Sequence, residues 1–138
     1  DDNLYWFIVW LRGVSDELWP QLKENFFGSL PPVIRDLAAA KVRKGVIRDI
    51  EGQGLGRHPQ ADIKTIMTLD LETLSALLGD KTYFMGDKES SLDATAYGFL
   101  DQLELAPLQS SMTELGTAYP NLVSFCHRVQ HTYYVSGT

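Results

Sequence analysis

Apolar residues recur at helical spacing along almost the whole chain, and this periodicity limits the fold more than any other feature. The clearest case is 63–78, where apolar residues return every third or fourth position and stop directly before Gly79. Runs that alternate between apolar and polar residues, which would indicate strands, are weak throughout. The sequence therefore predicts an all-α fold, a bundle of six to seven helices.

Proline and glycine residues mark where these helices begin and end. The first helix is apolar on every side, as a helix at the centre of a bundle would be. The second places Leu18, Trp19, Leu22 and Phe26 on an inner face. We read 79–87 as an ordered connector with two turns. The expected helices cover 4–11, 18–27, 33–50, 59–78, 90–106, 111–118 and 122–133.

Length and charge narrow the class of protein. The chain has 138 residues, which is enough for one domain, so we expect residues 1–138 to form a single helical domain. The net charge is −6 and falls entirely on residues 70–138, which makes general nucleic-acid binding a poor match. A local basic patch remains that could meet one acidic partner, and it consists of Arg35, Lys41, Arg43, Lys44 and Arg48 against Asp36.

The sequence also bears on where in the cell the protein is located and on whether the chain is part of a longer protein. The longest apolar run has eight residues, far below the roughly 20 that span a bilayer, so we expect no transmembrane helix. The single cysteine, Cys126, allows no internal disulfide and indicates a reducing compartment, which we take to be the cytoplasm. The chain has no initiator methionine and enters an apolar segment almost at once. We expect a fragment of a longer protein.

Several motifs are candidate functional sites, and most favour a structural interpretation. Ser90 and Asp93 form a capping box, in which the hydroxyl accepts from one backbone N–H and the carboxylate accepts from another. The glycines of 52–56, followed by Arg57 and His58, suggest an anion cradle but fit a helix C-cap better. Asp70 interrupts an apolar stripe, where we favour a buried structural carboxylate over one that opens onto a cleft.

The C-terminal segment raises the question of a metal site. His127 and His131 stand at i, i+4 beside Cys126, but no further ligand cluster is evident. We therefore predict no metal and treat Cys126 as a core residue. On the first helix, Trp6 and Trp10 could line a pocket for an apolar ligand, although core packing is favoured for at least one of them.

Read in order, these pieces resemble the C-terminal helical domain of glutathione S-transferases. The resemblance rests on the apolar first helix, the connector Tyr83-Phe84-Met85-Gly86-Asp87, the box Ser90-Ser91-Leu92-Asp93 and Tyr119-Pro120-Asn121-Leu122. The segments 26–32 and 53–58 are similar to the metaxin-like and failed-axon-connections-like branch. The resemblance covers nearly the whole chain. The apolar staple that often accompanies the box is missing, because Glu89 and Ala94 occupy its positions.

The resemblance implies a protein in two parts. An N-terminal thioredoxin-like domain, absent from this chain, would bind glutathione as co-substrate and activate its thiol, so this chain alone would hold no catalytic residue and no cofactor. The helical domain would supply the wall for a hydrophobic electrophile, with Tyr5, Trp6 and Trp10 as candidates, and part of a homodimer interface. The reaction would be conjugation or glutathione-dependent reduction. The alternative is a non-catalytic module that binds a protein or a membrane through the basic patch.

Overall fold

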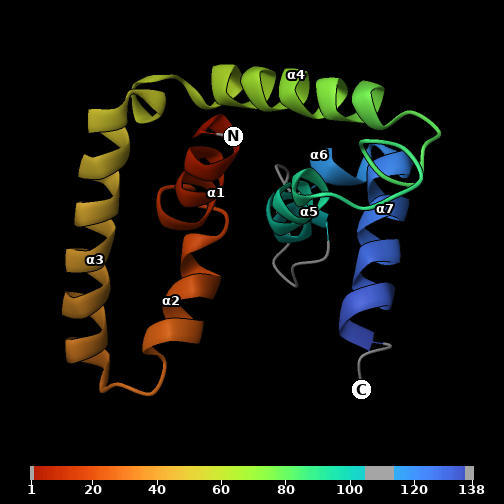
Figure 1. Cartoon of the computed structure of the whole chain (residues 1–138). Coiled ribbons are helices and arrows are strands. Elements are labelled where there is room, and N and C mark those ends of the chain that lie inside the picture. Colours follow the sequence, from red (N-terminus) through yellow and green to blue (C-terminus); the bar gives the residue numbers. More distant parts are fainter. Residues whose placement is uncertain (1, 105–113, 136–138) are drawn as a thin grey trace. The chain divides into compact units, whose positions relative to one another are not determined.

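The computed structural model describes residues 2–104 and 114–135 (Figure 1). Within these ranges the chain is helical, and the only pairing outside helices is an isolated bridge between Tyr83 and Gly86. The all-α prediction is confirmed. The elements are α1 (Asp2–Gly13), α2 (Trp19–Phe27), α3 (Pro32–Gln53), η1 (Leu55–Arg57), α4 (Gln60–Leu78), α5 (Ser91–Glu104), α6 (Glu114–Thr117), α7 (Pro120–Gln130) and η2 (His131–Val135).

Contacts divide the chain into two compact units, Asp1–Lys64 and Thr65–Thr138. The first contains α1, α2, α3 and η1, and the second contains most of α4 with everything that follows. That residues 1–138 act as a single domain stays a prediction. In the described part of the chain, no helix combines the length and the hydrophobicity needed to cross a bilayer.

In the first unit, α1 packs closely on α3. A Cβ atom at Gly13 would collide with the Val46 side chain, so only glycine allows this approach. The proline at the start of α3 supplies a helical φ without needing an N–H partner, and Gly54 ends the helix with a φ of 116°. The buried residues of these helices include Phe7, Trp10, Leu11, Leu18, Leu22 and Ala39.

Two details of the first unit differ from the expectations. Phe26, predicted to face inward, is 74% exposed, whereas Leu18 and Leu22 are buried. At 100° per residue, Phe26 lies about 80° around the helix from Leu18, so it leaves the buried stripe. The first helix is also not enclosed on every side, because Tyr5 is 52% exposed.

The second unit is built around buried residues of α4, α5 and α7. They include Met67, Leu71, Leu78, Leu100, Leu103, Leu122 and Phe125. Phe84, from the connector, meets Phe125 edge to face with ring centroids 5.2 Å apart. The apolar stripe of α4 is thus mostly buried, although Leu77, counted as part of it, is exposed.

The connector between α4 and α5 is ordered, as predicted. Tyr83 and Gly86 exchange backbone hydrogen bonds of 2.9 and 3.0 Å, and Gly86 has a φ of 125° that favours glycine. Arg128 of α7 donates to the carbonyl of Thr82 at 2.7 Å. The connector is therefore tied to α7 by a hydrogen bond between residues 46 positions apart in the sequence.

Candidate functional site

An apolar pocket of about 500 Å³ opens between α1, α2 and α3, and we call it the α1–α3 pocket. Its volume lies within the roughly 300–1,000 Å³ typical of small-molecule sites. Arg12 is the charged residue on its wall, and the rest of the lining is largely aliphatic and aromatic. The main lining residues are Val9, Trp19, Leu22, Phe27, Val42 and Val46. Such a lining suits an apolar ligand.

Arg43 holds one side of this pocket in place. Its guanidinium donates to the carbonyl of Val14 at 2.7 Å and to Asp16 at 2.6 Å. The same group lies 5.2 Å from the centre of the Trp19 ring, a cation–π distance. Arg43 therefore joins α3 to the segment between α1 and α2 and fixes the orientation of Trp19.

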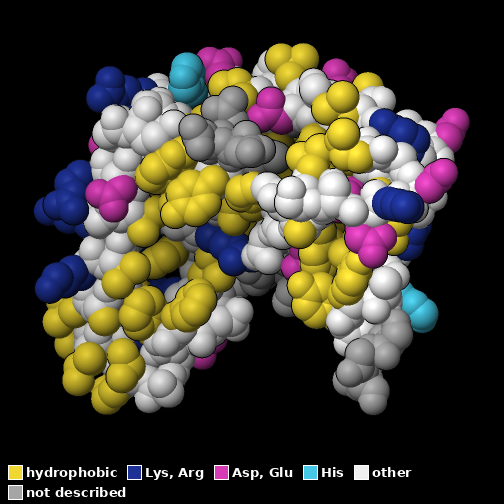
Figure 2. Space-filling view, in the orientation of Figure 1, with side chains coloured by type: hydrophobic (Ala, Val, Ile, Leu, Met, Phe, Trp, Pro, Cys, Tyr) yellow, Lys and Arg dark blue, Asp and Glu magenta, His cyan; other side chains and the backbone are white. Residues whose placement is uncertain are grey.

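The predicted basic patch is smaller than the sequence indicated. Arg43 is engaged as described, and Arg35 pairs with Glu24 at 3.2 Å. Both are neutralised within the first unit, which the linear count of charges could not reveal. Dark-blue Lys and Arg side chains nevertheless follow α3 in Figure 2. The exposed basic residues on one face of this helix, spaced i, i+3, i+7, are Lys41, Lys44 and Arg48.

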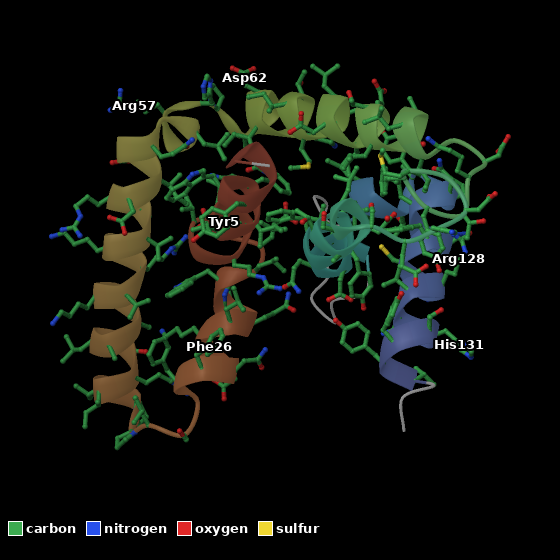
Figure 3. All side chains as sticks on the ribbon, viewed as in Figure 1. Tyr5, Phe26, Arg57, Asp62, Arg128 and His131 are labelled. Carbon is green, nitrogen blue, oxygen red and sulfur yellow. The ribbon has the colours of Figure 1, made fainter. Side chains whose placement is uncertain are left out.

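None of the three residues proposed for the co-substrate wall lines the α1–α3 pocket. Trp10 is only 6% exposed and stacks against Phe7, with ring centroids 6.1 Å apart. Tyr5 and Trp6 meet edge to face at 5.2 Å, and Figure 3 labels Tyr5 on α1. Tyr5 precedes the lining residue Val9 by one turn. The role of Tyr5, Trp6 and Trp10 in binding stays a prediction.

Ser90 and Asp93 form a tight hydrogen-bonded group at the start of α5. Asp93 is 3% exposed, and its carboxylate accepts from the N–H of Phe84 and the N–H of Ser90, each at 2.8 Å. The hydroxyl of Ser90 donates to the same carboxylate at 2.8 Å rather than accepting from a backbone N–H as we expected. The contact with Phe84 lies outside the capping motif and ties the connector to α5.

The other candidate sites are structural or isolated. Gly54 caps α3 by donating its N–H to the carbonyl of Ile50 at 3.0 Å, which is the C-cap interpretation. Arg57 donates to the carbonyl of Glu51 at 2.8 Å, and His58 is exposed. Asp70 is only half-buried on α4, not enclosed as we favoured.

The C-terminal histidines do not join Cys126. Cys126 is buried in the core, whereas His127 and His131 are exposed. Figure 3 shows His131 and Arg128 on the side of the chain turned away from α5. Among the side chains that the structure describes, no group of three or more His, Cys, Asp or Glu residues could hold a metal ion.

A second pocket, of about 330 Å³, lies entirely within the second unit, and we call it the tyrosine pocket. It is lined by Tyr83, Tyr97, Tyr133 and Tyr134, together with Glu89 and Asp93. Burial and the nearby Asp101 raise the pKa of Tyr97 to about 12. The hydrogen bond to Glu89 raises the pKa of Tyr133. Sequence reasoning missed this pocket because its residues lie up to 51 positions apart.

Comparison with known proteins shows what the chain is similar to. Residues 67–129 match the model for the glutathione S-transferase C-terminal domain. Over 96% of its length the chain is 29% identical to the isoprene-epoxide–glutathione S-transferase of Rhodococcus sp. (strain AD45). It is 38% identical to the metaxin-1 homolog of Caenorhabditis briggsae over 57% of the chain, and 32% identical to Failed axon connections of Drosophila melanogaster over 60%.

These matches cover only part of each relative. The chain spans 57% of the Rhodococcus protein, 26% of the metaxin-1 homolog and 21% of Failed axon connections. No solved structure matches the chain. The resemblance drawn from the sequence is confirmed, because the family match falls on the segment that holds the connector and the capping box. Residues 67–129 are thus similar to the glutathione S-transferase C-terminal domain, and the chain is similar to a metaxin and to Failed axon connections.

Proposed function

We propose that the full-length protein is a glutathione transferase-like enzyme in which this helical domain forms the wall for an apolar electrophile. The α1–α3 pocket is the observation that carries the proposal, because it is large enough for a small molecule and is lined mainly by apolar side chains. The domain that binds glutathione and activates its thiol would be the thioredoxin-like one that the family resemblance implies.

In this proposal the chemistry is nucleophilic attack by the glutathione thiolate. With an epoxide, the sulfur attacks a ring carbon, a C–S bond forms, the C–O bond breaks, and the alkoxide takes a proton from water. One relative carries an epoxide in its name, so small apolar epoxides are the first electrophiles to test. Glutathione-dependent reduction remains the other reaction that this arrangement would serve.

Conjugation by the full-length protein tests the proposal. Phe26 and Leu37 are both exposed apolar residues, but only Phe26 lines the α1–α3 pocket, so they form a matched pair. Phe26→Ala should raise KM for an apolar electrophile about three- to tenfold, as expected for lost apolar contact. Leu37→Ala should leave KM unchanged.

Two results would count against an enzyme with this pocket. One is the absence of any rate above background with several epoxides and aryl halides, combined with no glutathione binding in calorimetry. The other is an equal effect of the two alanine variants, which would place the electrophile elsewhere. Light scattering on the same protein would test the homodimer that the family resemblance implies.

A second function, a non-catalytic interaction module, is favoured by the surface of α3. Exposed apolar residues Val33, Ile34 and Leu37 are followed along the helix by the exposed basic face of Lys41, Lys44 and Arg48. This combination suits an acidic partner or an anionic lipid surface. A cytoplasmic location agrees with both functions, because a chain with a single cysteine, Cys126, forms no internal disulfide and suits a reducing compartment.

Charge reversal at Lys41, Lys44 and Arg48 tests this alternative in the full-length protein. Binding to vesicles of phosphatidylserine and phosphatidylcholine should fall at least tenfold, since each basic residue near such a surface contributes about 1 kcal/mol. Lys88→Glu, on an exposed lysine of the second unit, is the control. Equal binding by the triple variant and the wild type would exclude the basic face as the docking surface.

A further inference from the structure

The tyrosine pocket gathers an unusual share of the aromatic residues of the chain. Four of the six tyrosines line it, and they come from the connector, α5 and η2. Its volume of about 330 Å³ is at the lower end of small-molecule sites. The pocket is separate from the α1–α3 pocket, since all its lining residues belong to the second unit.

The charge of the pocket is negative. Glu89 and Asp93 are its charged lining residues, and no Lys or Arg of the described chain lines it. The surrounding sequence has the same sign, because residues 70–138 carry the whole net charge of −6. An anionic ligand would therefore be repelled. The N-terminus of α5 does not change this, since the Asp93 carboxylate already accepts from the N–H of Ser90.

Two of the four tyrosine hydroxyl groups donate to carboxylates, and the aromatic rings form much of the surface that faces a ligand. Tyr133 donates to Glu89 at 2.8 Å, and Tyr97 donates to Asp101 at 3.3 Å. Tyr97 and Tyr134 stack, with ring centroids 5.7 Å apart and planes 24° apart. These contacts hold the rings of Tyr97, Tyr133 and Tyr134 in place.

Aromatic rings around a negatively charged pocket are the arrangement that attracts a cation without N–H donors. Such a cation needs no hydrogen-bond acceptor, and the ring faces and the carboxylates compensate for its lost hydration. We propose that the tyrosine pocket binds an organic cation with a quaternary or fully alkylated ammonium head group. This site is independent of the proposed transferase reaction.

Choline and its uncharged isostere 3,3-dimethyl-1-butanol test the proposal, because the two differ in charge but hardly in shape. Binding to the full-length protein is followed by calorimetry and by chemical-shift changes at the pocket residues. Choline should bind saturably, in the millimolar range or tighter. The isostere should bind at least fivefold more weakly, as expected for the loss of cation–π and carboxylate attraction.

Variants at exposed positions locate the site without threatening the fold. Tyr134→Leu removes an aromatic face and should weaken choline binding about two- to fivefold, whereas Tyr134→Phe keeps the face and should retain binding. Glu89→Gln should also weaken it, and Glu72→Gln, on the exposed surface of α4, should not. Equal binding of choline and the isostere would overturn the proposal in favour of a neutral apolar ligand. The absence of saturable choline binding, or unchanged binding in Tyr134→Leu and Glu89→Gln, would also overturn it.

Discussion

Asp93 should be the most sensitive single position of the second unit. Its carboxylate is almost fully buried and accepts three hydrogen bonds of 2.8 Å, from Phe84, from the Ser90 backbone and from the Ser90 hydroxyl. Asp93→Ala removes all three acceptor contacts at once. The N–H of Phe84 belongs to a residue that is itself buried, so water cannot easily replace the lost partner.

The expected cost follows from these contacts. A hydrogen bond to a charged group contributes about 1.5–3 kcal/mol, and an unsatisfied buried N–H costs a similar amount, so Asp93→Ala should lower the free energy of unfolding by about 3–5 kcal/mol. Ser90→Ala removes only the hydroxyl, because the backbone N–H of Ser90 still reaches the carboxylate. It should cost about 1 kcal/mol and also slow refolding.

Urea unfolding of the full-length protein, followed by far-UV circular dichroism, measures both variants. Asp93→Asn is the informative intermediate, since its amide oxygen still accepts from Phe84 while its NH2 group faces a donor. We expect a loss of about 2 kcal/mol for it. If Asp93→Ala and Ser90→Ala cost the same amount, the contact between Asp93 and Phe84 contributes nothing, and the reasoning fails.

Three further predictions concern other contacts. Arg43→Met should lower the free energy of unfolding, measured in urea, by about 1–3 kcal/mol, because it removes two hydrogen bonds and the stacking on Trp19. Lys44→Met, on the exposed face of α3, should change this free energy by less than about 0.5 kcal/mol. Asn121→Ala should cost about 2–3 kcal/mol in the same assay, since Asn121 accepts from Ser75 at 2.7 Å and donates to its carbonyl at 2.9 Å. Because the pKa of Tyr97 is 10.0 unfolded and about 12 folded, the unfolded chain loses this proton first, so stability should fall between pH 10 and 12, and less so in Tyr97→Phe.

The helical class, the ordered connector and the family could be predicted because they depend on local patterns. The capping box needs residues three positions apart, and the C-cap at Gly54 needs one glycine after an apolar run. The helical periodicity of apolar residues did not predict which of them would be buried by a neighbouring helix. Phe26, Val33 and Leu37 fit a helical stripe as well as Leu22 does, yet they are exposed. Spacing gives the face of a helix, not the neighbour that buries it.

Contacts between residues far apart in the sequence could not be predicted either, because spacing along the chain does not show which segments become neighbours. Arg43 pairs with Asp16, which lies 27 positions away in the sequence. A count of charges along the chain could not show this pairing, and it therefore placed Arg43 in an exposed basic patch. The tyrosine pocket joins Tyr83 with Tyr134, and neither residue belongs to a motif for ligand binding. The smaller extent of the basic patch and the existence of the tyrosine pocket therefore became visible only in the folded structure.

The two units also differ in how strongly their contacts restrict the sequence. In the second unit, Asp93, Asn121 and Arg128 bind backbone atoms of other segments, and each contact requires a side chain of one type and length. In the first, the α1–α3 pocket is lined by aliphatic and aromatic residues that can replace one another at similar volume. The family match, residues 67–129, covers the segment that makes these backbone contacts and does not cover the pocket.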